Sequence, residues 1–155
     1  MNVTRRRGVI KLRLEPVERD VLTSMFDDLA ISLQDDNLAP DDPVRRRLYP
    51  DGYGDREAAA EFRELTESSL TYDRTERISQ CTAELALDGD LPLDADAGQR
   101  WIKALNDLRL ALGTRLEISD DDDLSVAADA QSDPGHAIYQ WLTVVQDSLV
   151  RALMK

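Results

Sequence analysis

Apolar residues recur with the period of an α-helix in four long segments of this 155-residue chain. The segments are 16–34, 55–87, 101–113 and 134–153. Pro16 and Pro134 suit the first turn of a helix, and the sequence Asp-Gly-Asp at 88–90 ends the second segment. The sequence TESSL at 66–70 predicts a bend or short interruption, because Ser and Thr compete for backbone hydrogen bonds. The pattern predicts four to five helices.

Two short segments alternate apolar and polar residues, which is typical of half-buried strands. They are GVIKLRLE at 8–15 and TRLEIS at 114–119. Because an isolated two-stranded ribbon is only marginally stable, we expect the two strands to pair and to pack on the helices. The prediction is a mainly helical α+β fold, with one domain over residues 1–155 and an exposed acidic loop at 120–132.

The charge of the chain disfavours nucleic acid as a direct ligand. Asp and Glu total 31 against 19 Lys and Arg, giving a formal net charge of -12. Duplex binding depends on Lys and Arg displacing counterions, so any DNA contact should be weak or indirect. Basic residues gather in two places, namely Arg5, Arg6, Arg7, Lys11 and Arg13, and then Arg45, Arg46 and Arg47. The acidic segment 114–135 is an internal partner for the first group, and a structural or protein-binding use of both is favoured.

Residue patterns of known catalytic and metal sites are missing from the sequence. No glycine-rich loop precedes a Lys, His136 is the only histidine, and the acids at 120–123 lack the spacing of a calcium loop. We therefore expect no enzyme activity, cofactor or metal. No signal peptide or membrane-spanning apolar run is evident, so we expect a cytoplasmic protein. Cys81 is the only cysteine and lies on the apolar helical face, so we expect it to be buried and slow to oxidise.

The connector RRRLYPDGYG at 45–54 is the most distinctive stretch. Tyr49 and Tyr53 flank a Pro-Asp-Gly turn, so both rings can pack while their hydroxyls find partners. Polar residues in the helix at 101–113 are the expected partners, with Arg47 or Arg63 pairing with Asp51 or Asp107. A buried network that orders the connector and a binding surface for a partner protein both remain open. The candidate partner-binding residues are Arg45, Arg46, Arg47, Tyr49, Tyr53, Arg63, Asp107 and Arg109.

Two blocks of sequence, RLYPDGYGDREAAAEFRELTE and WIKALNDLRLALGTRLEI, resemble an actinobacterial family first described as a domain of unknown function. It is the AosR, or actinomycete oxidative-stress regulator, family. The resemblance implies a cytoplasmic regulator of the oxidative-stress response that acts on cysteine-biosynthesis genes together with a stress sigma factor. The alternative is an adaptor for a cytoplasmic protease or another machine. A homodimer is left open.

Overall fold

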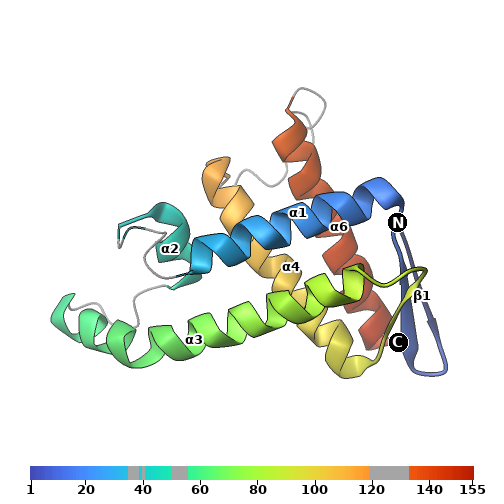
Figure 1. Ribbon diagram of the computed structural model, residues 1–155, viewed down its shortest axis with the longest axis horizontal. Helices are drawn as coiled ribbons and strands as arrows, with labels where there is room; N and C mark the ends of the chain where they lie inside the picture. Colours follow the sequence, from blue (N-terminus) through green and yellow to red (C-terminus); the bar gives the residue numbers. More distant parts are fainter. Residues whose placement is uncertain (35–38, 40, 50–55, 119–132) are drawn as a thin grey trace.

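The computed structural model describes residues 1–34, 39, 41–49, 56–118 and 133–155, with the backbone alone for 56–66 and 68. The elements in chain order are β1 (Asn2–Arg6), β2 (Val9–Arg13), α1 (Pro16–Leu33), α2 (Pro43–Leu48), α3 (Arg56–Leu85), β3 (Leu91–Leu93), α4 (Ala95–Arg115) and α6 (Pro134–Met154) (Figure 1). Helices dominate and one small sheet stands at an end of the bundle, so the predicted mainly helical α+β fold is confirmed. None of the described helices is long and apolar enough to cross a bilayer.

Helix α4 lies at the centre of the fold. It contacts α1, α2, α3 and α6 as well as strands β2 and β3. Trp101 of α4 is fully buried and meets Phe26 of α1 edge-on, with ring centroids 6.0 Å apart. This geometry suits the quadrupoles of the two rings. Because other elements contact α4 on several sides, a charged side chain on one of its buried faces must find partners inside the protein.

Strand β2 has the alternation that the sequence predicts. Ile10 and Leu12 are fully buried, and the residues between and after them are exposed. The partner predicted for this strand is wrong, because the sheet has three antiparallel strands in the order β1-β2-β3. Strand β3 places Leu93 opposite Ile10 and Leu91 opposite Leu12. Neither outer strand was predicted. The arginines in β1 interrupt the apolar alternation typical of a strand, and β3 is only three residues long.

The strand predicted near 114–119 is wrong for its described part. Helix α4 continues past Gly113 and closes in a Schellman motif. Glu117 takes the left-handed conformation with a φ of 58°, and the N–H of Ile118 donates to the carbonyl oxygen of Gly113 at 2.8 Å. Gly113 itself stands inside the helix, where an added Cβ would come within 3.0 Å of the Tyr139 ring on α6. The apolar alternation here belongs to a helix end.

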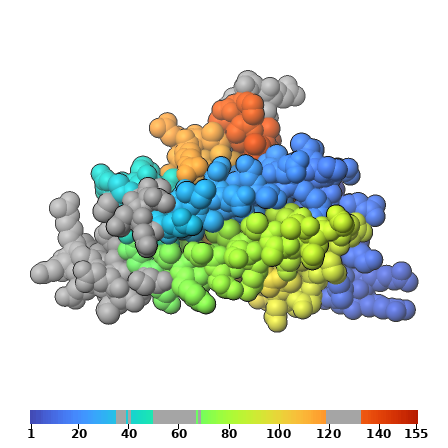
Figure 2. Space-filling model, viewed as in Figure 1, coloured from blue at the N-terminus to red at the C-terminus, as the bar shows by residue number. Residues whose placement is uncertain are grey.

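Helix α3 runs without interruption from Arg56 to Leu85, so the interruption predicted at 66–70 is wrong. Its buried residues Ile78 and Cys81 face the core, and α3 packs beside α1 across one face of the molecule (Figure 2). This packing outweighs the weak capping preference of the serines. The predicted acidic loop at 120–132 lies outside the described residues.

Candidate functional site

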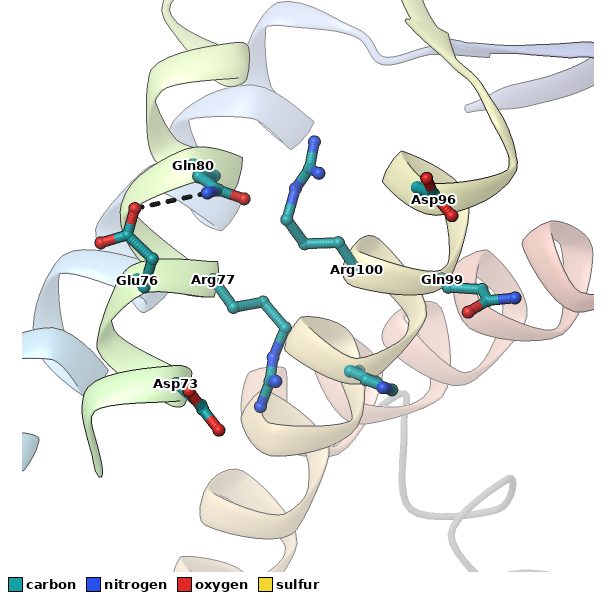
Figure 3. Close-up of a pocket in the computed structure, with 8 residues that line it drawn as sticks. Asp73, Glu76, Arg77, Gln80, Asp96, Gln99 and Arg100 are labelled. Carbon is teal, nitrogen blue, oxygen red and sulfur yellow. Dashed lines mark hydrogen bonds between the residues drawn. The ribbon is translucent and has the colours of Figure 1, made fainter. Parts of the chain in front are cut away.

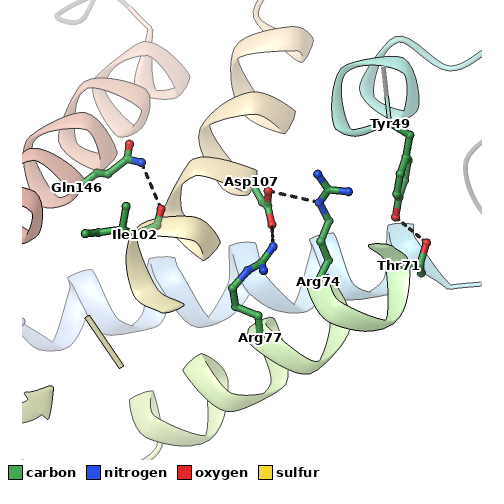
Figure 4. A network of polar contacts seen from close by, with 7 residues as sticks. All are labelled: Tyr49, Thr71, Arg74, Arg77, Ile102, Asp107 and Gln146. Carbon is green, nitrogen blue, oxygen red and sulfur yellow. Dashed lines mark hydrogen bonds and ion pairs between the residues drawn. The ribbon is translucent and has the colours of Figure 1, made fainter. Parts of the chain in front are cut away.

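Asp107 of α4 is, among the described residues, the one charged side chain that is buried, with 4% of its surface exposed. Its Oδ2 accepts a hydrogen bond from Nη2 of Arg77 at 2.8 Å, and its Oδ1 accepts one from Nε of Arg74 at 3.4 Å (Figure 4). The two arginines are three residues apart on α3, so both face α4. Two guanidinium groups therefore compensate one buried carboxylate and join α3 to α4.

A network links Tyr49 of the connector to Asp107, and it runs through Arg74. The predicted pairings that involve Asp51 or Arg63 lie outside the described residues. The guanidinium of Arg74 lies over the ring of Tyr49, 4.8 Å from its centroid, while its Nε reaches Asp107. The hydroxyl of Tyr49 forms a hydrogen bond of 2.7 Å with Oγ1 of Thr71. The connector is thus tied to the buried carboxylate through a cation–π contact and an ion pair. The sequence gives no signal that singles out Arg74 and Arg77, because they are two of several arginines in a helix with many charged residues.

The three arginines of helix α2 differ in how far they are buried. Arg45 is half-buried and forms an ion pair with Glu67 of α3. Arg46 and Arg47 are exposed. Val44 and Leu48 fix the opposite side of α2 in the core. A short, anchored helix therefore holds two cationic side chains at the surface. Tyr53 lies outside the described residues, and so does the side chain of Arg63.

Arg109 lies on the other side of α4 and faces α6, away from the connector. Its Nε donates to Oγ1 of Thr143 at 3.0 Å, and its Nη1 donates to Oε1 of Gln146 at 2.9 Å. The guanidinium also stands 5.2 Å from the centroid of the Tyr139 ring. The structure therefore does not bring Arg109 together with Tyr49 and Asp107.

A groove of about 260 Å³ opens between α3 and α4 (Figure 3). Its charged lining residues are Asp73, Glu76, Asp96, Arg77, Arg100 and Lys103. The side chains of Arg77 and Arg100 extend in opposite directions along it (Figure 3). Each is already paired, Arg77 with Asp107 and Arg100 with Glu84. Three carboxylates and Lys103 then remain to determine the character of the groove, so it does not select an anionic ligand.

Cys81 lies in the core next to this interface, and its side chain is fully buried, as predicted. Burial raises the pKa of its thiol to about 12, and the negative charge of Glu84 adds to this. The guanidinium groups of Arg77 and Arg100 act in the opposite direction and do not offset it. The thiolate is the reactive form, so the native environment makes Cys81 a poor nucleophile.

Part of the N-terminal basic group supports the fold. The Nη1 of Arg5 donates to the carbonyl oxygens of Ala152 and Leu153 at 2.9 and 3.1 Å, at the C-terminal end of α6. A cation suits this end because unpaired carbonyl groups make it negative. Arg13 pairs with Asp90 at 2.9 Å. These partners differ from the acidic segment predicted at 114–135, most of which lies outside the described residues.

Comparison with known proteins places the chain in a family. A model of the family "Domain of unknown function (DUF2017)" matches residues 1–153. The "Putative oxidative stress regulator AosR" of Mycobacterium leprae is 37% identical over 130 residues, and the "Oxidative stress regulator AosR" of Mycobacterium tuberculosis is 34% identical over 131 residues. Each match covers 74% of this chain and 60% of the relative's own length. No solved structure matches the chain. The chain therefore belongs to the DUF2017 family, the family of the oxidative stress regulator AosR.

Proposed function

We propose that this protein regulates gene expression under oxidative stress by binding a protein partner, with a stress sigma factor as the first candidate. The observation that carries the proposal is the identity of 34–37% to proteins named as oxidative stress regulators. The protein acts through contacts and has no catalytic role of its own. An adaptor for a protease or another cytoplasmic machine is the second candidate function.

The proposed contact surface is the exposed side of α2, which carries Arg46 and Arg47. Tyr49 and Asp107 are buried and do not touch the partner; they hold α2 in place through Arg74. A cationic pair on a fixed helix loses little entropy when it binds an acidic surface, and complementary charge also speeds encounter. This arrangement supports recognition by a protein and requires no substrate cleft.

The environment of Cys81 supports placing the peroxide response in the partner. The only thiol of the chain is fully buried and has a pKa of about 12, so very little thiolate is present near neutral pH. A single cysteine also cannot form an intramolecular disulfide. The regulator then reads the redox state through binding, because its own thiol is protected.

Affinity capture from an extract of the source organism, with and without peroxide, tests the proposal. We expect RNA polymerase and a stress sigma factor to be recovered, and Arg46→Glu with Arg47→Glu to reduce that recovery. Lys103→Glu on the α3–α4 groove is the matched charge-reversal control and should leave recovery unchanged. Protease subunits in place of polymerase would favour the adaptor function. Recovery of neither polymerase nor sigma factor, with the protein intact, would contradict the regulatory proposal.

A further inference from the structure

We propose that the free edge of β1, together with the last turns of α6, binds an extended acidic segment of a partner protein, which joins the sheet as a fourth strand. The site lies at the end of the bundle opposite α2 (Figure 1). It is independent of the surface assigned to Arg46 and Arg47, and it holds whether or not the partner is a sigma factor.

Strand β1 has main-chain groups that point away from the rest of the sheet. In the part of the chain that the structure describes, the sheet order β1-β2-β3 leaves β1 paired on one side only. A two-residue turn joins β1 to β2, with Arg6 opposite Val9, so Arg6 directs its N–H and C=O groups toward β2. In an antiparallel ladder this direction alternates along the strand. Thr4 therefore bonds to β2 as Arg6 does, while Val3 and Arg5 direct their N–H and C=O groups to the open edge.

A groove lies beside the open edge of β1. Its volume is about 440 Å³, and it runs between Val3, Thr4 and Arg5 of β1 and a face of α6 that includes Ser148 and Arg151. The hairpin and the C-terminal end of α6 lie next to each other (Figure 1). An added strand would thus gain both main-chain hydrogen bonds and a wall for its side chains.

The charged side chains that line this groove are basic. Among the described residues that line the groove, the charged ones are Arg5, Arg151 and Lys155. Asp147 pairs with Arg151 at 2.9 Å across one exposed helical turn, a contact of small energy that a stronger partner can displace. Arg6 and Lys11 add positive charge on the outer face of the sheet. The charged side chains that line this groove are cationic although the whole chain carries a formal charge of -12.

These features favour an acidic peptide over nucleic acid and over a second copy of the chain. A peptide strand supplies the N–H and C=O groups that the β1 edge requires, and a phosphate backbone has no N–H groups to offer. The net charge of the whole protein further opposes a duplex. Pairing of two β1 edges would bring the Arg5 and Arg151 side chains of both copies together, and like charges at close range disfavour that dimer.

The test uses the full chain and a probe peptide of about ten residues that alternates Glu and Thr, with Lys-Thr and N-methylated Glu-Thr peptides as controls. We expect the Glu-Thr peptide to bind at low salt and to weaken as salt rises. On binding, hydrogen exchange of the Val3 and Arg5 amides should slow, while the Thr4 and Arg6 amides are already protected. N-methylation at alternate residues should abolish binding without changing the charge.

Arg151→Glu should weaken peptide binding about tenfold, because it places like charge against the peptide. Lys103→Glu on α4 is the matched charge-reversal control and should leave the affinity unchanged. Equal binding of the N-methylated peptide, or an unchanged affinity in Arg151→Glu, would overturn the proposal. So would tighter binding of duplex DNA than of the peptide, or a dimer that buries the β1 edge. Loss of sigma-factor capture alone would count against the proposed function and leave this site standing.

Discussion

Arginine performs opposite tasks at the α3–α4 interface and at the β1–α6 edge. At the interface, Arg74 and Arg77 form ion pairs with a single buried carboxylate, that of Asp107. At the edge, Arg5 meets neutral carbonyl oxygens of α6, and Arg151 meets an exposed carboxylate of its own helix. At the edge the charged side chain of Arg151 is 75% exposed, whereas those of Arg74 and Arg77 at the interface are only 15% and 18% exposed. The local pairing of charges, more than their number, therefore determines which region is available to a partner.

The same difference predicts where mutations act. At a buried ion pair, removing one partner leaves the other charge unpaired in a region of low dielectric constant. At an exposed edge, water replaces the lost partner, so stability changes little while binding changes much. Substitutions at the α3–α4 interface should thus alter folding, and substitutions at the β1–α6 edge should alter recognition.

Asp107→Ala should have the largest effect. It leaves the guanidinium groups of Arg74 and Arg77 without their carboxylate, so we expect the free energy of unfolding to fall by about 3 kcal/mol. Urea denaturation followed by tryptophan fluorescence measures this, because Trp101 lies in the same helix. Replacing Asp107 together with both arginines by apolar residues should recover part of the loss. An unfolding midpoint within error of wild type for Asp107→Ala would mean that the ion pairs do not hold the interface.

Arg109→Met should have an intermediate effect. The methionine keeps the packing but loses the hydrogen bonds to Thr143 and Gln146 and the contact with Tyr139. Because these partners are neutral, no charge is stranded, and we expect a loss of about 1 to 2 kcal/mol. The comparison requires this loss to be smaller than that of Asp107→Ala under the same urea titration. The opposite order would show that the hydrogen bonds to α6 outweigh the buried ion pairs.

Elements with a hydrophobic period over many residues were predictable from the sequence. Elements that depend on pairing with a distant segment were not. The helical periods are long enough to average out local noise, and Ile10 and Leu12 alternate clearly. The segment after Gly113 alternates equally well, yet it closes a helix, because a left-handed Glu117 leaves no periodic signal. Strand β3 is too short to show a period, and it forms because Leu91 and Leu93 complete the core beside β2.

The candidate site divides in the same way. Asp107 stood out because a carboxylate in an apolar helix must be paired, and the structure provides the pair. The identity of its partners could not be read, since Arg74 and Arg77 look like ordinary surface arginines in α3. Arg109 lies on a different side of α4 from Asp107, because two residues along a helix correspond to a rotation of about 200°. The open edge of β1 could not be predicted from the sequence, because a strand is an edge strand only when no other strand pairs with one of its sides.

Cys81 gives a smaller effect that tests how closed the interface is. With a pKa of about 12, roughly one thiol in ten thousand is ionised at pH 8, so native labelling by a maleimide or by peroxide should be slow. The labelling rate should rise with pH up to about 12, since deprotonation creates the nucleophile. Denatured protein, which should label at once, is the control. Rapid native labelling, or a disulfide-linked dimer at low peroxide, would identify Cys81 as a direct sensor and contradict the closed interface.

Val3→Pro in β1 should have the smallest effect on stability, and comparing it with Thr4→Pro tests the open edge directly. Val3 directs its N–H to the open edge, so Val3→Pro removes no ladder bond. Val3 is only partly buried against the core, so we expect a loss of about 1 kcal/mol or less from reduced packing. Thr4 directs its N–H to β2, so Thr4→Pro should cost about 1 to 3 kcal/mol through the lost bond. Urea denaturation separates the two, and peptide titration then shows whether Val3→Pro, with its fold intact, binds the Glu-Thr probe more weakly than wild type. Equal losses of stability at both positions would mean that the edge is covered. Unchanged peptide binding in Val3→Pro would mean that the partner reads charge at this end of the molecule without pairing with the strand.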